Sequence, residues 1–193
     1  MRNGFAWETR KENRAVTVKF GGWVELRPSR SGNLRVTYHN TDDVLAVPYD
    51  VAMVGYHNQV VNNLRLWSAE APINAGTDFT LGQKERINQI TQILYPDDSD
   101  ASGKQLRLRQ EYFFTSAGIQ SIVRHYRRTH NSMAGFADRV AIHINDTHPA
   151  IAIPELMRVL MDDEHVSWDE AWRITLKVMS YTNHTLLSEA LEV

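Results

Sequence analysis

Two apolar stretches of this chain each run into a polar cluster that could bind a ligand. Residues 140–144 lead into Asn-Asp-Thr-His-Pro at 145–149, and residues 178–182 lead into Asn-His-Thr at 183–185. In open α/β sheets, ligand sites lie beyond the carboxyl ends of buried strands. We therefore expect both stretches to be buried strands whose polar ends face a common pocket.

A zinc hydrolase is one chemistry these clusters could support, with four candidate ligands: His143, Asp146, His148 and His184. Asp-x-His is a plausible zinc ligand pair, but residues 143 and 146 of a continuous strand point to opposite faces. The structural alternative makes Asp146 and His148 a hydrogen-bonded pair that caps a helix after Pro149. On the residues alone the structural alternative is favoured, and we expect no metal site. No G-x-S-x-G, P-loop or G-x-G-x-x-G motif is present, so those enzyme classes lose their usual support.

Composition narrows the class of protein. The 193 residues suffice for one substantial core, and 42% hydrophobic with 23% charged residues is ordinary for a globular chain. A net charge of −2 gives no reason to expect nucleic acid or an anionic membrane as a partner. There is no cysteine, no apolar run near the roughly 20 residues that span a bilayer, and no signal-peptide pattern at residues 1–8. These features predict a soluble, cytoplasmic protein.

The first part of the chain predicts strands. Residues 14–51 form a β-rich region with four short alternating runs, which we expect to pair as an antiparallel meander ending before Pro48. Residues 52–193 form an α/β region that begins with a strand at 60–69. Arg65 and Trp67 share one face of that strand, where they form either a sugar-facing or interface surface or, at least as often, core.

The second part is mainly helical. Helical spacing predicts helices over residues 82–94 and 104–129, separated by an acidic loop at 97–103 that is either a solvated connection or a mobile gate. Four basic residues cluster near the end of the second helix, where the helix dipole stabilises positive charge: Arg124, His125, Arg127 and Arg128. The alternative to this structural role is a phosphate-binding site. Further helices begin at Pro154 and at the Ser167–Glu170 capping box, the latter with Trp168, Ala171, Trp172 and either Thr175 or Leu176 facing inward.

Eight segments in the same order resemble the α-glucan (glycogen, starch or maltodextrin) phosphorylase family: residues 47–50, 55–56, 61–69, 94–96, 103–113, 144–149, 152–158 and 181–185. The resemblance implies cleavage of a terminal α-1,4-glucosidic bond by inorganic phosphate, giving glucose 1-phosphate with retention. It also implies pyridoxal phosphate as cofactor and two Rossmann-like domains of the GT-B type. The chain would be an internal fragment, residues 1–193, of the N-terminal domain.

The same resemblance assigns residues to the substrate. His184 matches the histidine that contacts the sugar 6-hydroxyl and whose backbone carbonyl lies near the anomeric carbon, where a fixed dipole favours oxocarbenium charge. Asn183 precedes it in the same motif and is assigned to substrate binding. Asp146 and His148 match the wall of the glucose site.

Two further matches are incomplete. Asp98 and Ser99 fall on the family's gating loop and are assigned to substrate binding. Ser99 stands where the family commonly has asparagine, so the resemblance does not carry over the sugar contact of that amide or the usual closure of the loop. Arg124 and His125 match a position where allosteric members carry two arginines for a nucleotide phosphate. A histidine there weakens bidentate phosphate binding, so we expect a member without AMP activation.

Other family elements are missing from these residues. The glycine-rich phosphate loop and the lysine that binds pyridoxal phosphate match no segment, so we expect no cofactor-binding residue on this chain. The isolated chain should be inactive and give no borohydride-reducible Schiff base, whereas its parent should be a homodimeric enzyme. The alternative is a non-catalytic glucan-binding or interaction module on the same scaffold.

Overall fold

The structure, a computed structural model, describes residues 7–28, 34–72 and 80–184. The chain forms two compact units, and each is described by itself. Unit 1 comprises residues 1–23 and 39–117, and unit 2 comprises residues 24–38 and 118–193. The last of the predicted strand-end residues, Thr185, lies outside the described residues, and so does the end of the chain that follows it. The division into regions 14–51 and 52–193 stays a prediction.

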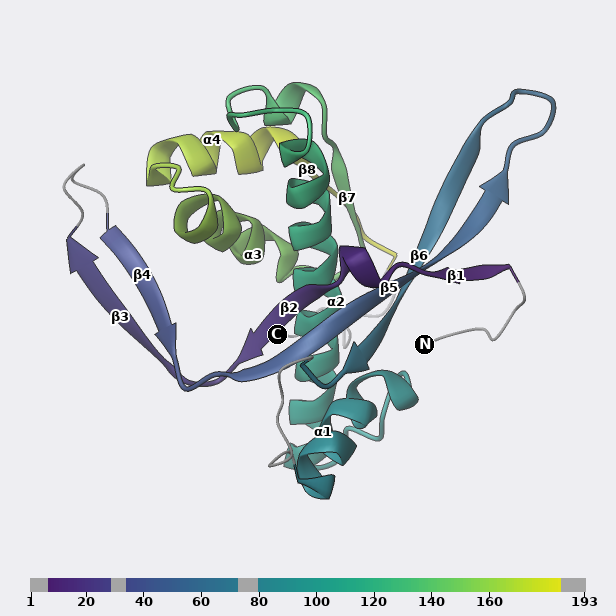
Figure 1. The fold of residues 1–193 in the computed structure, drawn as a ribbon, viewed down its shortest axis with the longest axis vertical. Coiled ribbons are helices and arrows are strands. Elements are labelled where there is room, and N and C mark those ends of the chain that lie inside the picture. The colour runs from purple at the N-terminus through teal and green to yellow at the C-terminus, as the bar shows by residue number, and fades with distance from the viewer. Residues whose placement is uncertain (1–6, 29–33, 73–79, 185–193) are drawn as a thin grey trace. The chain divides into compact units, whose positions relative to one another are not determined.

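Unit 1 is built on a four-stranded antiparallel sheet with β5 (Asp42–Val54) at its centre (Figure 1). On one side β5 pairs with β1 (Glu8–Arg10) and β2 (Val16–Phe20), which are separated by the short helix η1 (Glu12–Arg14). On the other side it pairs with β6 (Val61–Glu70), and the two strands form a long hairpin.

The expected meander is wrong. Strand β2 pairs with β5, whereas β3 (Trp23–Pro28) and β4 (Leu34–His39) form a separate two-stranded sheet. Gly21 and Gly22, a pair that permits a turn, both have positive φ and lead the chain out of the first sheet. A Cβ on Gly22 would overlap the carbonyl oxygen of His39, so glycine is required where the chain changes sheets.

Strand β5 does not end before Pro48, as expected, but continues through it. The carbonyl of Pro48 accepts a hydrogen bond from the amide of Lys11 at 2.9 Å, between the segments that pair with β1 and with β2. In an antiparallel ladder the N and C=O of one residue face the same neighbour. The missing N–H of Pro48 therefore faces the interruption occupied by η1, where a central strand tolerates proline.

Two helices pack on the core of unit 1. Helix α1 (Leu81–Gln92) begins with a capping box between Thr80 and Gln83, and α2 (Ala101–Arg127) begins after the acidic loop. The bounds of both helices agree with the predicted bounds to within three residues, so both predictions are confirmed. Trp67 is buried, at 7% exposure, in a core shared by the sheet and both helices, so the core interpretation of Trp67 is confirmed: Val16, Val18, Phe20, Val44, Ala46, Trp67, Ala69, Ile87, Ile90, Phe113 and Ala117.

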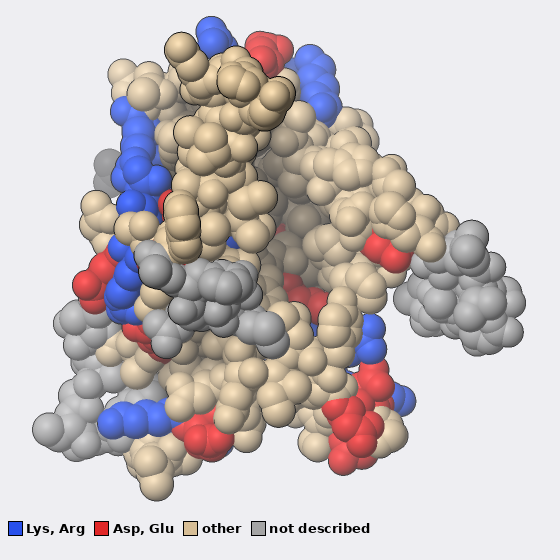
Figure 2. Space-filling model, turned by 90° about the vertical axis from the view of Figure 1, so that its right-hand side faces the viewer, with Lys and Arg blue, Asp and Glu red and all other residues tan. Residues whose placement is uncertain are grey.

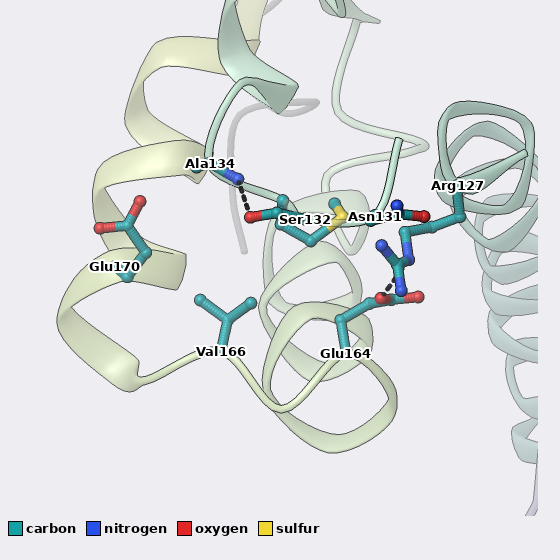
Figure 3. A pocket seen from close by; sticks show the side chains of 8 residues that line it. Arg127, Asn131, Ser132, Ala134, Glu164, Val166 and Glu170 are labelled. Carbon is teal, nitrogen blue, oxygen red and sulfur yellow. Dashed lines mark hydrogen bonds and ion pairs between the residues drawn. The ribbon is translucent and has the colours of Figure 1, made fainter. Parts of the chain in front are cut away.

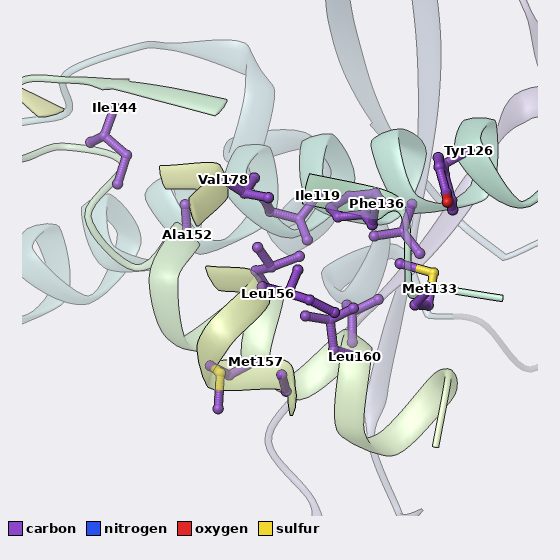
Figure 4. Close-up of a cluster of buried hydrophobic side chains, with 14 residues drawn as sticks. Ile119, Tyr126, Met133, Phe136, Ile144, Ala152, Leu156, Met157, Leu160 and Val178 are labelled. Carbon is purple, nitrogen blue, oxygen red and sulfur yellow. The ribbon is translucent and has the colours of Figure 1, made fainter. Parts of the chain in front are cut away.

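Unit 2 contains a parallel pair of strands connected through helices. Strand β7 (Ile142–Asn145) is followed by α3 (Ala152–Arg158), a π-helical turn at Val159–Asp163, α4 (Trp168–Val178) and β8 (Met179–Thr182). The short helix η2 (Phe136–Asp138) lies between α2 and β7. Figure 4 shows the side chains that fill this unit's core, among them Phe136, Leu156 and Leu160, which are fully buried.

The inward face of α4 is only partly as expected. Ala171, Ile174, Thr175 and Val178 are buried, whereas Trp168, Trp172 and Leu176 are 62%, 43% and 62% exposed. Both sets follow helical spacing and both contain apolar residues, so periodicity alone could not choose between them. Among the described residues no helix combines the length and hydropathy needed to cross a bilayer.

The hairpin formed by β3 and β4 is joined to the helices of unit 2 through Tyr38. Its hydroxyl donates to the carboxylate of Asp162, and the guanidinium of Arg158 lies 5.9 Å from its ring centroid. Arg158 itself forms two hydrogen bonds of 2.8 and 2.9 Å with Glu155, which is buried. Burial and the bond to Asp162 raise the pKa of Tyr38 to about 12.

The raised pKa of Tyr38 predicts an alkaline stability change. A raised pKa means that the folded chain holds the phenol proton more tightly than the unfolded chain does. The contribution is therefore complete below pH 10.0 and is lost as pH rises to about 12. Urea unfolding of the unsubstituted chain and of Tyr38→Phe across this pH range measures the contribution, because only the phenylalanine variant lacks the phenol proton. Equal pH dependence of the two proteins would contradict the assignment.

Candidate strand-end site and gating loop

The parallel pairing of β7 and β8 brings the two polar clusters together. His143 is level with Ser180 and Asn145 with Thr182, and the amide of Asp146 donates to the carbonyl of Thr182 at 2.8 Å. Ile144 is buried on one face of β7, while His143 and Asn145 are exposed on the other. Strand β7 therefore has one buried face, and its polar face ends beside that of β8. The expectation that both stretches are buried strands is wrong for β8, in which Ser180, Tyr181 and Thr182 are exposed.

Asn145 and His184 are in direct contact across the two strand ends. The Oδ1 atom of Asn145 lies 2.5 Å from Nε2 of His184. With Oδ1 as the acceptor, Nε2 carries the proton and Nδ1 of the neutral ring is an acceptor. With this tautomer, the contact orients the imidazole and leaves Nδ1 to accept a hydrogen bond from a ligand hydroxyl. Asn145 was not among the residues we singled out for the substrate, although it begins the predicted polar cluster.

Asp146 turns the chain away from β7. Its φ of 65° is left-handed, a conformation that aspartate tolerates better than most residues. Its Oδ1 accepts from the amide of Thr147 at 2.8 Å, and its side chain is half-buried. The N-cap of α3 is Ile151, which makes no side-chain capping bond, so the expectation that Asp146 or His148 caps this helix is wrong. His148 is exposed on the same turn, and Asn183 is exposed just after β8.

His143 is held by hydroxyl groups. Its Nδ1 lies 2.7 Å from Oγ of Ser180, and its Nε2 lies 2.7 Å from Oγ1 of Thr182. Across residues 7–28, 34–72 and 80–184, no three histidine or carboxylate side chains are grouped to hold a metal ion. The hypothesis of a zinc site at residues 143–184 therefore gains no support from the geometry.

The acidic loop in unit 1 packs closely on the start of α2. Asp98 forms an ion pair with Arg107, with Oδ2 and Nη1 2.5 Å apart. Asp100 accepts from the amide of Gly103 at 2.7 Å and thereby satisfies one of the orphan amides at the start of α2. A Cβ on Gly103 would overlap the carbonyl oxygen of Asp97 and lie 3.0 Å from Cα of Asp98.

Two carboxylates of this loop, Asp97 and Asp100, are stabilised in their ionised form. The backbone amide of Ser99 donates to Asp97, and that of Gly103 to Asp100, so the pKa of each carboxyl is lowered. Ser99 itself is exposed. Sequence reasoning identified Asp98 and Ser99 but not Arg107 or Gly103, although residues 103–113 belong to a segment that carries the family resemblance.

A pocket of about 320 Å³ lies near the C-terminal end of α2 (Figure 3). Arg127 reaches Glu164 at 2.9 Å, and Glu170 lines the same pocket. Arg124 and His125 are exposed on α2 and do not line it. With its arginine already paired and two carboxylates in the wall, this pocket is poorly suited to a phosphate group. On the face drawn in Figure 2, small groups of Lys and Arg and of Asp and Glu side chains are scattered over a surface of mostly uncharged residues.

Comparisons with known proteins show the family of this chain. A family profile described as carbohydrate phosphorylase matches residues 1–193. The chain belongs to the carbohydrate phosphorylase family. It is 48% identical over 192 residues to a glycogen phosphorylase of Bacillus subtilis (strain 168), covering 100% of this chain and 24% of that protein.

Two further relatives match the whole of this chain. It is 44% identical over 200 residues to a glycogen phosphorylase of Haemophilus influenzae and 44% identical over 208 residues to the brain form of Bos taurus. In each case 100% of this chain is covered but only 24% of the relative. The phosphorylase chain thus spans about a quarter of the length of these curated relatives.

Proposed function

We propose that this chain is the strand-end wall and gating loop of an α-glucan phosphorylase. The parent protein would cleave a terminal α-1,4-glucosidic bond with inorganic phosphate and release glucose 1-phosphate. Family membership over residues 1–193 supports this proposal, and the contact between Asn145 and His184 is the structural observation that carries it. The parent would be a cytoplasmic homodimer with a GT-B arrangement of two Rossmann-like domains.

His184 has the geometry to orient a sugar. With its proton on Nε2 and held by Asn145, Nδ1 can accept a hydrogen bond from a sugar hydroxyl, for which we propose the 6-hydroxyl. Its backbone carbonyl, placed near the anomeric carbon, would favour the positive charge that develops as the glycosidic bond breaks. Asp146, His148 and Asn183 would contact other sugar hydroxyls as acceptors or donors. None of these side chains is assigned to bond making.

The acidic loop would act as the gate that the family resemblance implies. Asp98 and Ser99 lie on this loop, and its attachment to α2 through Arg107 gives it a defined resting position. Ser99 supplies a short hydroxyl where related enzymes have an amide, so its reach toward a sugar is shorter. We propose that Asp98 and Ser99 contribute to substrate binding only when the loop is closed.

Pyridoxal phosphate is the cofactor implied by the family, and its aldehyde would require a lysine. The chain has five lysines, of which four are exposed and Lys11 is half-buried. None of them lines the pocket beside Arg127 or a second pocket, which lies between the acidic loop and α1 and includes Gln89, Tyr95 and Gly103. The residues of this chain do not fit an attachment site, so polypeptide outside it would hold the cofactor.

We do not expect this protein to be regulated by a nucleotide. Arg124 and His125 offer one fork of guanidinium donors and one imidazole, which cannot bind two phosphate oxygens bidentately as paired arginines do. The pocket beside Arg127 is lined by two carboxylates, Glu164 and Glu170.

The test is phosphorolysis by the parent protein at the length of its relatives. His184→Ala should lower kcat/KM for a maltooligosaccharide about 10- to 100-fold, the loss expected when one well-placed hydrogen bond to substrate disappears. Asn145→Leu should give a smaller loss in the same direction, because the imidazole is then unrestrained. His57→Asn, at an exposed histidine in the turn between β5 and β6, is the control and should retain full activity. A glucan-binding module would instead bind the oligosaccharide and form no glucose 1-phosphate.

A further inference from the structure

In the structure, residues 94–99 form the gating loop, because α2 already begins at Ala101, and groups on α2 hold both ends of this loop. Before the loop, the buried side chain of Gln110 donates to the carbonyl of Ile93 at 2.6 Å. After the loop, Asp100 accepts from the amide of Gly103 at 2.7 Å and from the hydroxyl of Ser102 at 3.0 Å. Movement of the loop is therefore confined to the residues between these two anchors, 94–99.

The middle of the loop is attached by a contact of a different kind. Asp98 meets Arg107 through an ion pair that is partly open to solvent, with side-chain exposures of 44% and 35%. Ion pairs this exposed contribute little to stability and are screened by salt. A contact of this strength can form and break readily while Gln110 and Asp100 keep both ends fixed.

Arg107 has a second partner within its own helix. Its Nε atom lies 3.5 Å from Oε1 of Glu111, four residues further along α2. The ring of Tyr95, at the start of the loop, lies 6.0 Å from the guanidinium. When Asp98 leaves, Arg107 can turn fully to Glu111, so the opened state does not strand a cation.

We propose that Arg107 is a positioning residue that sets the open and closed populations of residues 94–99 by sharing its guanidinium between Asp98 and Glu111. This inference rests on the proposed role of the loop as the gate of the glucose site. It assigns Arg107 no contact with substrate. Removing Arg107 should favour the detached loop, whereas removing Glu111 should favour the attached one.

Spin labelling tests this directly, because the chain contains no cysteine. Ser99→Cys places a single nitroxide on the exposed middle of the loop, and its spectrum gives the ratio of mobile to immobile label in the 193-residue chain. Arg107→Gln should raise that ratio about two- to fivefold, the range that corresponds to an exposed ion pair. Glu111→Gln should lower it, and Arg107→Lys should restore part of the attachment. High salt should raise the ratio of mobile to immobile label in the chain with Arg107 but not in the Arg107→Gln variant.

Arg127→Gln is the matched control, since Arg127 lies on the same helix but pairs with Glu164. It should leave the label unchanged, and circular dichroism confirms that each variant is folded. An unchanged ratio in Arg107→Gln, or a raised ratio in Glu111→Gln, would overturn the proposal.

The proposed function can fail without affecting this result, because label mobility needs no catalysis. In an active parent protein, Arg107→Gln should change KM for the glucan by a similar two- to fivefold factor while leaving kcat nearly constant. A merely destabilised protein would instead lose both activity and amount of folded enzyme.

Discussion

Replacing Arg65 with methionine is expected to lower the free energy of unfolding by about 3–5 kcal/mol, the range for breaking a buried ion pair. Arg65 donates from Nε and Nη2 to the two carboxylate oxygens of Asp50 at 2.6 and 2.7 Å. The side chain of Asp50 is only 6% exposed and sits on the central strand β5. Without Arg65, a carboxylate would remain buried with much of its compensation removed.

Urea unfolding at neutral pH measures this loss, and a matched pair supplies the control. Arg27 forms an ion pair with Glu25, and the side chain of Arg27 is 70% exposed. Arg27→Met should therefore change the unfolding free energy by no more than about 0.5 kcal/mol. The double variant Asp50→Leu with Arg65→Met should recover most of the loss, because no charge is then buried. Equal effects of Arg65→Met and Arg27→Met would refute the assignment.

The same pair makes a prediction in acid. The hydrogen bond from Arg65 lowers the pKa of Asp50 below its ordinary value of 3.8. A lowered pKa means that the contribution is complete above pH 3.8 and is lost as pH falls through the lower folded value. The difference in unfolding free energy between the unsubstituted chain and Arg65→Met should therefore shrink as the pH falls below 3.8.

Replacing Gly103 with alanine should lower the free energy of unfolding by about 3 kcal/mol, at the upper end of the usual cost of overpacking. The new Cβ would overlap the carbonyl oxygen of Asp97 and lie 2.8 Å from its carbonyl carbon. These are backbone atoms, so no side-chain rotation can relieve the clash. The backbone of Asp97 must therefore be displaced from the start of α2, where it is closely packed.

Gly118, on the same helix, provides the control for Gly103. A Cβ there meets nothing within 4 Å, so Gly118→Ala should stabilise the chain by about 0.5–1 kcal/mol through helix propensity alone. Thermal unfolding separates the two variants by sign. If Gly103→Ala also stabilised the chain, the close packing of the loop on α2 would be incorrect.

The elements that sequence predicted well are those with strong local signals. The spacing of Tyr112, Ser116, Ile119, Val123 and Tyr126 predicted α2, and Ser167 accepts the predicted capping bond from the amide of Glu170 at 3.4 Å. The polar clusters after β7 and β8 are side by side as expected, because the apolar runs before them form parallel strands.

The failures share a different cause, which is dependence on partners distant in sequence. Gly21 and Gly22 permit a turn, but only the tertiary structure decides that β2 pairs with β5 and not with β3. On α4 two apolar stripes compete, and the small side chain of Ala171 lies in the core while Trp172 does not. Arg107 could not be assigned to Asp98, because nothing in their spacing fixes how the loop folds back on α2.

The most direct test of the central claim is a single assay of the parent protein for glucose 1-phosphate. The parent at the length of its relatives is incubated with maltoheptaose and inorganic phosphate, and the anomer formed is identified by NMR. Our account predicts α-glucose 1-phosphate, with a rate about 10- to 100-fold lower in His184→Ala. Glucan binding without any glucose 1-phosphate, or full activity in His184→Ala, would contradict it.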